Sequence, residues 1–373
     1  MRSCSAPPKL LIYRRGWSAT GGAERYLRRF ADGLESENIG VVILADQTWP
    51  AEAWNGHPIE RIDGAPDPSG CLDGIRSRHP GAVLFSMERI PGADVFRAGD
   101  GVHAAWLERL DREEGTVRGI FRRSRPLHRG ILAREAAMFG GPGLKIVANS
   151  GMVADELVRY HHIRREQIAV IPNGYDAPDI PAGERAVRRS AKRAGLGIPE
   201  DDVVFLFVGS GWKRKGAQTA IDAFLSLAKP GCHLVIAGKG RARRTAQPGI
   251  HLTGPVPDPT DLYLAADVFV LPTLYDPFSN ACLEAAAFGL PVLTTDANGF
   301  AEVLRDHDGS GEVIPVPRTT HAWAEAMERW TEPGIREAAR APLSRIRGHH
   351  TVSRNVTATI EFIRTAIPEP ATP

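Results

Sequence analysis

Short runs of hydrophobic residues alternate with longer segments of mixed polarity along the whole chain. The runs are hydrophobic at every position rather than at every second one, which is typical of strands covered on both faces of a parallel sheet. They are, in order, KLLIY, VVILA, AVLFS, IVANS, VVFLFVG, HLVIAG, HLTG, VFVLP and PVLTT. Helix-sized segments separate them, among them residues 22–34, 217–227 and 281–288. This order predicts an α/β protein built from doubly wound sheets.

The alternation lapses near residues 172–202, where proline and glycine become frequent. We therefore predict two Rossmann-like domains, residues 1–172 and 173–350, with a linker in this segment. Residues 351–367 have the pattern of one more helix, which we expect to cross back to the N-terminal domain. Because open α/β sheets bind ligands at the carboxyl ends of their strands, we expect the two sheets to face each other across an interdomain cleft.

The composition is that of a folded globular protein, with 373 residues, 43% of them hydrophobic and 24% charged. The hydrophobic runs are much shorter than the ~20 residues that a membrane-spanning helix needs, and the N-terminus lacks the hydrophobic core of a signal peptide. The four cysteines are scattered, without a C-x-x-C pair, which favours reduced thiols. We expect a cytoplasmic protein.

The second predicted domain opens with VVFLFVGSGWKRKGAQTAIDAF, a strand followed by glycines, cations and a helix. Gly209 and Gly211 leave backbone amides accessible, and Arg214 and Lys215 stand just before the positive N-terminus of the helix. The segment predicts an anion site suited to phosphate, with an exposed basic turn as the alternative. It lacks G-x-x-x-x-G-K-[ST] and is therefore not a nucleoside-triphosphate P-loop.

The helix ACLEAAAF is hydrophobic on all sides yet carries a carboxylate, Glu284, in its first turns. Burying an ionised carboxylate without a partner is costly, and a helix-dipole interaction of about 0.3–1 kcal/mol is small against that cost. We predict that Glu284 accepts hydrogen bonds from a polyol, with vicinal ribose hydroxyls as the natural partner. Asp276 is expected to bind a second polyol. The backbone amides of Phe278, Ser279 and Asn280 are expected to face phosphate or sugar oxygens.

Two further patterns admit simpler interpretations. Gly21 and Gly22 precede an amphipathic helix and permit close backbone approach to a ligand, but a plain loop explains the pair equally well. The D-x-D pattern Asp306-His307-Asp308 lies in the glycine-rich segment RDHDGSG. A turn explains it better than a metal-binding pair of carboxylates, so we expect no metal and no other cofactor.

Together these motifs resemble the retaining nucleotide-sugar glycosyltransferases of family 4, which have the two-domain GT-B fold. The resemblance covers nearly the whole chain. It rests on the R-K-G segment, the carboxylate-x7-carboxylate element that runs into LEAAAFGLPVLTT, the glycine pair, IPNG and AADVFVLPT. More narrowly, RIPGADVFRAGDGVHAAW and the arginine-rich segment after it are similar to the lipopolysaccharide core glucosyltransferases, which add glucose to inner-core heptose.

The resemblance implies a metal-independent hexosyltransferase that uses a nucleotide-sugar, UDP-glucose in the narrower comparison, as a substrate. Arg214 and Lys215 would bind the donor diphosphate and stabilise the charge that develops on it. Glu284 would hold the ribose hydroxyls and Asp276 the transferred sugar, with the amides of residues 278–280 near that sugar or its phosphate. Gly21 and Gly22 would pass close to the diphosphate.

Asp100 lies where the lipopolysaccharide enzymes have an acid near the reacting sugar, so the resemblance makes it a base or an electrostatic stabiliser. His103 is a second candidate in the same region. Two positions depart from the family pattern. Asp276 stands where glutamate is usual, and Ser279 stands where glycine is usual.

Eight arginines fall among hydrophobic residues between Arg109 and Arg134. A solvated helix face accounts for them, and so does an amphipathic surface for anionic lipid over residues 106–134. An amphipathic surface would bring the enzyme to a lipid-linked or lipopolysaccharide core acceptor. The enzyme would then be peripheral on the inner face of the plasma membrane. No nucleic-acid-binding motif accompanies the charge, so nucleic acid is not expected as a partner.

Three alternatives stay open. The chain is also consistent with a glycosyltransferase of another cell-surface polysaccharide that uses a different donor. A sugar-nucleotide epimerase can have the same fold, and a non-catalytic nucleotide-sugar sensor would bind the donor without turnover. A nicotinamide oxidoreductase is disfavoured because GSGWKRKG does not continue as G-x-G-x-x-G.

Overall fold

The computed structural model describes residues 9–17, 22–49, 54, 56–62, 69–141, 143–316 and 319–365. The chain forms two compact units. The N-terminal unit comprises Met1–Asn173 and Val352–Pro373, and the C-terminal unit comprises Gly174–Thr351. Each unit is built around a parallel sheet with helices on both faces, which confirms the predicted pair of Rossmann-like domains.

The sheet of the N-terminal unit has seven parallel strands among the described residues, in the order β3-β2-β1-β4-β5-β6-β7. The strands are β1 (Lys9–Tyr13), β2 (Gly40–Ala45), β3 (Ile59–Arg61), β4 (Val83–Ser86), β5 (Val95–Arg97), β6 (Lys145–Ala148) and β7 (Ile168–Val170). The helices are α1 (Gly22–Ser36), α2 (Ser69–Arg78), α3 (His103–Glu114), α4 (Thr116–Arg123), α5 (Pro126–Phe139), α6 (Gly151–His161) and α16 (Val352–Arg364), with a 3-10 turn at Arg165–Gln167.

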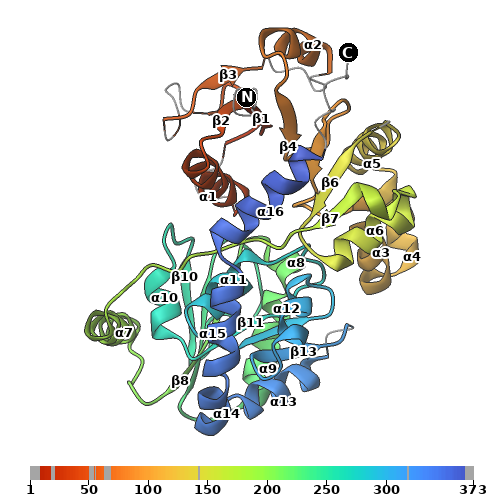
Figure 1. Ribbon diagram of the computed structural model, residues 1–373. Helices are drawn as coiled ribbons and strands as arrows, with labels where there is room; N and C mark the ends of the chain where they lie inside the picture. Colours follow the sequence, from red (N-terminus) through yellow and green to blue (C-terminus); the bar gives the residue numbers. More distant parts are fainter. Residues whose placement is uncertain are drawn as a thin grey trace. The chain divides into compact units, whose positions relative to one another are not determined.

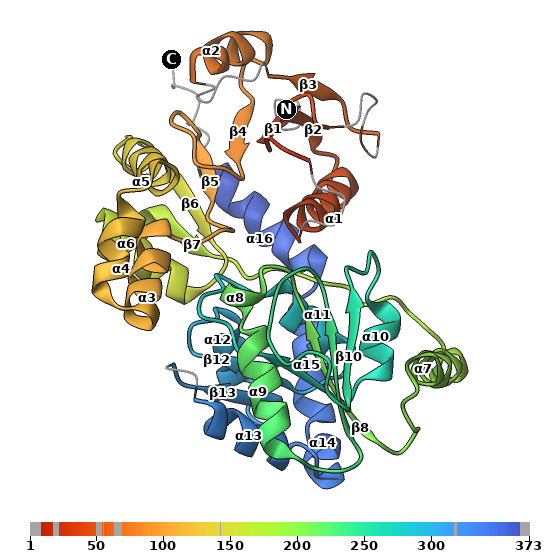
Figure 2. The same cartoon turned by 180° about the vertical axis from the view of Figure 1, so that it is seen from behind.

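Both faces of this sheet are buried, because successive residues of β1 point to opposite sides. Leu10 and Ile12 share one hydrophobic cluster with α1 and with Val356 of α16. Leu11 and Tyr13 belong to a second cluster, on the side of α2. Helices α1 and α16, from opposite ends of the chain, therefore complete the same core and lie side by side (Figures 1 and 2).

The C-terminal unit has a sheet of six parallel strands among its described residues, in the order β10-β9-β8-β11-β12-β13. The strands are β8 (Val203–Val208), β9 (Cys232–Ala237), β10 (Ile250–Gly254), β11 (Val268–Leu271), β12 (Val292–Thr295) and β13 (Gly311–Ile314). The helices are α7 (Ala182–Leu196), α8 (Trp212–Lys215), α9 (Ala217–Leu227), α10 (Thr260–Ala265), α11 (Asn280–Ala287), α12 (Phe300–Asp306), α13 (Thr320–Arg329), α14 (Pro333–Ala338) and α15 (Arg340–His349).

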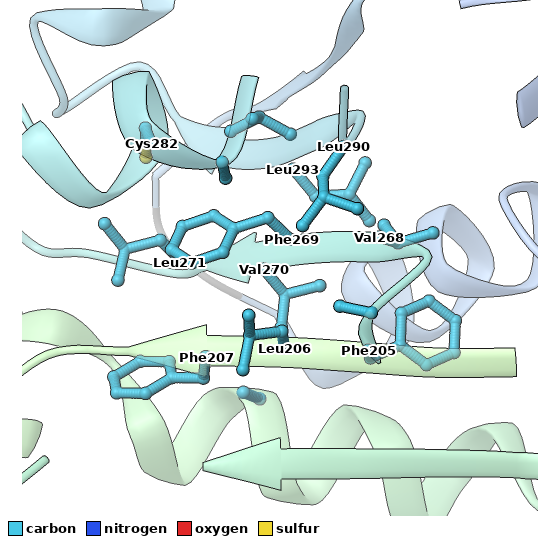
Figure 3. Packing of buried hydrophobic residues seen from close by; sticks show 14 of the residues in the cluster. Phe205, Leu206, Phe207, Val268, Phe269, Val270, Leu271, Cys282, Leu290 and Leu293 are labelled. Carbon is cyan, nitrogen blue, oxygen red and sulfur yellow. The ribbon is translucent and has the colours of Figure 1, made fainter. Parts of the chain in front are cut away.

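Hydrophobic residues of the two central strands fill the core of this unit. Figure 3 shows Phe205 and Phe207 of β8 beside Phe269 and Leu271 of β11, with Cys282 of α11 packed onto the same cluster. Helices α10, α11 and α15 cover the face turned to the viewer in Figure 1, and α9 and α13 cover the opposite face in Figure 2. Because both faces are covered, the central strands β8 and β11 have no polar side, as their continuous hydrophobic runs predict.

Helix α7 lies within residues 172–202, the segment in which the sequence predicts a linker. This helix has no hydrophobic stripe. Among its described residues, the buried one is Arg193. Arg193 donates to the Ala265 carbonyl at 2.9 Å and to Asp267 Oδ2 at 2.7 Å. Arg189 donates to Asp267 Oδ1 at 2.8 Å. Guanidinium groups therefore attach α7 to the segment around Asp267. Hydrophobic periodicity does not reveal such contacts.

Candidate functional site

The loops that follow β8 and β11 meet at the carboxyl edge of the C-terminal sheet. The strand order places β8 between β9 and β11, so the chain winds in one direction after β8 and in the other direction from β11 onward. Such a switch point opens a crevice at the carboxyl ends of the strands, where open α/β sheets bind their ligands. Both motifs predicted from the sequence follow these two strands.

Helix α8 is a single turn that presents Arg214 and Lys215 at this edge. Gly211 precedes it and Gly216 follows it, with φ values of 73° and 84°. A residue with a Cβ rarely adopts this left-handed conformation, so glycine is required at both ends of the turn. The Arg214 carbonyl accepts a hydrogen bond from the Leu274 amide at 2.8 Å. The turn is thereby fixed to the loop after β11.

Asp276 brings a carboxylate to these two cations. Lys215 Nζ donates to Asp276 Oδ2 in a close ion pair, and Arg214 Nη1 lies 3.8 Å from the same oxygen. Arg214 also donates to the Tyr275 carbonyl at 2.7 Å. The side chain of Arg214 is 37% exposed, whereas that of Lys215 is 13% exposed and that of Asp276 7%. Arg214 therefore offers the most open positive surface, and Asp276 acts as the counter-ion of Lys215.

The loop after β12 holds the start of α11 in place. The Asp276 amide donates to the Ala297 carbonyl at 2.9 Å. Ser279 caps the helix, because its Oγ accepts from the Cys282 amide at 3.4 Å. The Ser279 amide itself donates to Asn298 Oδ1 at 3.2 Å. The expectation that this amide faces a ligand therefore differs from the structure, because the amide already donates its hydrogen bond to Asn298.

The neighbours of Ser279 have different surroundings. The Phe278 side chain is buried, with its ring edge-on to that of Phe300 at a centroid distance of 5.7 Å. Asn280 is the first residue of α11 and is half-buried. The N-terminus of this helix points the positive end of its dipole to the same edge as Arg214. The predicted donor-binding residues of the C-terminal unit thus gather around one switch point.

Glu284 is buried, at 2% exposure, and its Oε2 accepts a hydrogen bond from the Tyr263 hydroxyl at 3.0 Å. Tyr263 comes from α10, and its ring stacks on Phe288 with the centroids 5.2 Å apart. Sequence analysis did not find Tyr263. The signal was available, because a tyrosine in the hydrophobic segment DLYLAA needs a partner for its hydroxyl when it is buried. An ionised carboxylate has about four acceptor sites and can accept from several donors at once.

In the N-terminal unit, Asp100 lies at the tip of a tight turn after β5. The turn is closed by the Gly101 amide, which donates to the Ala98 carbonyl at 3.1 Å. Arg89 donates to the Gly101 carbonyl at 2.8 Å and fixes the turn from the neighbouring loop. Asp100 is exposed. Gly22 is the first residue of α1, and Gly21 lies outside the described residues.

A charged network next to Asp100 was not predicted from the sequence. Arg14 donates to Glu24 at 2.8 Å and to Glu88 at 3.4 Å, and the Arg15 amide donates to Glu88 at 2.8 Å. Burial acts to lower the pKa of Arg14, but its bond to Glu24 and the charges of Glu24, Glu88 and Asp100 raise it. Burial raises the pKa of Glu88. The carboxyl edge of the N-terminal sheet therefore holds an arginine among three acids.

His103 is occupied by contacts within the N-terminal unit. Its amide donates to Glu135 Oε1 at 2.7 Å, and its Nε2 lies 3.0 Å from His128 Nδ1. Burial lowers the pKa of His103 to about 4. The imidazole is therefore neutral at physiological pH and connects the start of α3 to α5.

The D-x-D pattern lies at the end of α12, away from any group of side chains suited to a metal. Asp308 accepts a hydrogen bond from the Gly309 amide at 3.0 Å, and His307 Nδ1 bonds to the Val303 carbonyl at 2.9 Å. The part of the chain that the structure describes contains no cluster of three or more His, Cys, Asp or Glu side chains placed to hold a metal ion.

None of the helices in the described part of the chain is both long enough and hydrophobic enough to span a bilayer.

Comparisons with known proteins agree with this arrangement. A family model described as Glycosyltransferase Family 4 matches residues 20–178, and one described as Glycosyl transferases group 1 matches residues 202–332. The lipopolysaccharide glucosyltransferase WaaG of Escherichia coli K12 is 27% identical over 264 residues, which are 67% of this chain and 68% of that protein. A D-inositol 3-phosphate glycosyltransferase of Saccharomonospora viridis is 30% identical over 223 residues, 54% of this chain and half of that protein.

Solved structures show the same fold. The crystal structure of WaaG has a TM-score of 0.76 at 20% identity and covers 95% of this chain and 99% of that one. Anabaena HepE in complex with UDP and glucose has a TM-score of 0.70 at 17% identity, over 96% of this chain and all of that one. The chain is therefore a glycosyltransferase of the GT-B type, related to WaaG and to other glycosyltransferases, which confirms the predicted resemblance.

Proposed function

We propose that this glycosyltransferase moves glucose from UDP-glucose onto a lipopolysaccharide core or a related glycolipid, with retention of configuration. The observation that carries the proposal is the set of Arg214, Lys215, Asp276 and Glu284 at one switch point. WaaG is named a lipopolysaccharide glucosyltransferase, and a structure of HepE is described with UDP-glucose, so related chains support both the donor and the acceptor.

The donor binds with its diphosphate on the α8 turn and its ribose on α11. Arg214, the more exposed cation, meets the diphosphate first. Lys215 donates to Asp276 Oδ2 and, with another of its N–H groups, to a phosphate oxygen. The other carboxylate oxygen of Asp276 accepts a hydrogen bond from a sugar hydroxyl. Glu284 accepts hydrogen bonds from the ribose hydroxyls while Tyr263 fixes the orientation of the carboxylate. Each hydrogen bond to a charged group contributes about 1.5–3 kcal/mol.

Transfer breaks the bond between the anomeric carbon and the diphosphate oxygen and leaves the electron pair on the diphosphate. Arg214, Lys215 and the N-terminus of α11 stabilise that charge as it develops, without reorganising. The acceptor hydroxyl oxygen forms the new bond to the anomeric carbon, and its proton leaves to a base. We assign Asp100 to a position near the reacting sugar. Its carboxylate either accepts the proton of the acceptor hydroxyl or stabilises the positive charge that develops on the sugar ring.

A transfer assay tests this proposal. UDP-glucose is incubated with a core glycolipid that ends in heptose, in EDTA, and both UDP release and the glycosylated product are measured. We expect equimolar UDP and glucosylated product, with the α configuration of the donor retained in the NMR spectrum of the product. Transfer from ADP-glucose or GDP-sugars in place of UDP-glucose would identify another donor, and loss of activity in EDTA would overturn metal independence.

We also propose that α4 and α5 dock on an anionic membrane surface. Phe121 and Leu127 are 71% and 67% exposed, among the highest values for large hydrophobic side chains in the described part of the chain. The same two helices and the turn between them carry four exposed arginines, Arg118, Arg125, Arg129 and Arg134. Other arginines of the segment are paired, such as Arg122 with Asp111 at 2.6 Å. An exposed arginine near an anionic membrane contributes about 1 kcal/mol, so the charge fits the surface on which a glycolipid acceptor resides.

Vesicle sedimentation measures this docking. We expect binding to phosphatidylglycerol vesicles that falls as salt rises, because the Debye length shortens from about 10 Å at 0.1 M to about 3 Å at 1 M. The Phe121→Ser/Leu127→Ser variant is expected to lose most of the bound fraction. Val187→Ser is the matched control, because Val187 is 69% exposed on α7. Equal binding to phosphatidylcholine vesicles, or an unaffected double variant, would contradict the proposal.

A further inference from the structure

The C-terminal unit contains a cavity of about 400 Å³ whose lining includes none of Arg214, Lys215, Asp276 and Glu284. Its walls come from helices α7, α10, α14 and α15 and from the loop between α11 and β12. Its volume is within the range of small-molecule sites, roughly 300–1,000 Å³. The arginines and aromatic residues that line it are Arg185, Arg189, Tyr263, Phe288, Arg336 and Arg340.

Two of its four arginines have carbonyls as their partners. Arg185 donates to the Phe288 carbonyl at 3.2 Å, and Arg336 donates to the Trp330 carbonyl at 2.8 Å and the Thr331 carbonyl at 2.5 Å. Among the residues that the structure describes, no carboxylate forms an ion pair with either guanidinium. These two cations are therefore uncompensated at the wall of a cavity.

The other two arginines already have acids as partners. Arg189 is paired with Asp267 at 2.8 Å, and Arg340 with Glu337 at 2.9 Å. Asp267 is also shared with Arg193 at 2.7 Å, so it cannot neutralise a further cation. The cavity consequently carries an excess of positive charge. Burial and the charge of nearby Arg347 lower the pKa of Arg185, which is the effect of a site that lacks an anion.

We propose that this cavity binds a small phosphorylated molecule, with Arg185 and Arg336 on its phosphate group. Planar guanidinium groups match the geometry of phosphate oxygens and form charge-assisted hydrogen bonds with them. The cavity is larger than a phosphate ion, and hydrophobic residues among its lining, Leu264, Leu290 and Pro291, suit the less polar part of such a molecule. Nothing in the donor site requires this cavity, so it is a second binding site.

Tyr263 connects the cavity to the proposed donor site. Tyr263 is one of the residues that line the cavity, while its hydroxyl donates to Glu284 Oε2 at 3.0 Å. A ligand that contacts Tyr263 from the cavity restrains this residue, and hence the orientation of the Glu284 carboxylate. We expect phosphate binding in the cavity to strengthen nucleotide binding. This coupling rests on the proposed function of Glu284, whereas the phosphate site does not.

Calorimetric titration of inorganic phosphate tests the site. Wild type is expected to bind, and Arg185→Gln/Arg336→Gln to bind at least tenfold more weakly with an unchanged melting temperature. Arg188→Gln is the matched control, because Arg188 lies on the same helix but pairs with Asp261, and it is expected to bind as wild type does. The site is overturned if wild type binds no phosphate, if the double variant binds it equally, or if Arg214→Ala/Lys215→Ala abolishes all binding.

The coupling is measured as the affinity for UDP with and without phosphate. Phosphate can also compete with UDP at the donor diphosphate site, and this competition is the same in all the proteins. Its effect on UDP affinity is measured in Arg185→Gln/Arg336→Gln, which lacks the phosphate site in the cavity. Relative to that variant, phosphate is expected to tighten UDP binding by wild type at least fivefold, a typical allosteric coupling. Tyr263→Phe should still bind phosphate but lose this gain. Equal responses in all three overturn the coupling, while failure of wild type to bind UDP counts against the donor site alone.

Discussion

The Lys215→Ala enzyme is expected to turn over about a hundredfold more slowly than wild type, or slower still. Removing one preorganised donor to a developing negative charge costs about 2.7–4 kcal/mol in other enzymes. The structure adds a second cost, because the substitution leaves the carboxylate of Asp276, 7% exposed, without its close partner. That uncompensated charge would repel the donor diphosphate. The kcat for glucose transfer at saturating UDP-glucose is the quantity to measure.

Two control variants separate these effects. Lys213→Ala removes the same charge from the same helical turn, where Lys213 is exposed, and is expected to keep the kcat within about threefold of wild type. The double variant Lys215→Ala/Asp276→Asn removes the uncompensated carboxylate. It should bind UDP better than Lys215→Ala while remaining slow in transfer, since the donor to the leaving group is still absent. A Lys215→Ala enzyme with the kcat of wild type would contradict the assignment of Lys215 to the diphosphate.

Much of the fold could be predicted from the sequence because most strands are buried on both faces. The residues from Val204 to Phe207 are all buried, and the run VVFLFV has no polar position. The strands that escaped prediction are short or polar: Ile59–Arg61, Val95–Arg97, Ile168–Val170 and Gly311–Ile314. A run of three or four residues carries little periodic signal, and its pairing with neighbours decides its structure.

Helix α7 escaped prediction for a different reason. Its sequence, AGERAVRRSAKRAGL, has the charge of a solvated segment, and its helical propensity alone does not show where it docks. Arg193 is fully buried and reaches four backbone carbonyls, those of Ala265, Pro199, Glu200 and Asp202. An arginine that serves as a core residue has no signature in the hydrophobic pattern.

The candidate site was predictable where its residues follow strands of one sheet. Arg214 and Lys215 come after β8 and Asp276 after β11, so the strand order alone brings them to one edge. Their pairing was not predictable. The sequence assigned Lys215 and Asp276 to separate parts of a ligand, whereas the structure joins them in an ion pair. Contacts between side chains far apart in the chain depend on the exact packing of the loops.

Glu284 raised the question of what a buried carboxylate binds, and Tyr263 is one answer within the chain. If Glu284 also holds the ribose, Glu284→Ala is expected to weaken nucleotide binding about tenfold to a hundredfold, because a hydrogen bond to a charged group contributes about 1.5–3 kcal/mol. Glu284→Gln is the matched variant. Its amide oxygen can still accept from Tyr263, so it preserves the packing while removing the charge.

Calorimetric titration of UDP, GDP, ADP and dTDP into wild type, Glu284→Ala and Glu284→Gln, with EDTA present, tests the central claim most directly. We predict that wild type binds UDP in preference to the other three nucleotides, and that both variants bind it more weakly while melting at similar temperatures. No binding of any of the four by wild type, or equal affinity for UDP in all three proteins, would contradict a donor site built on Glu284.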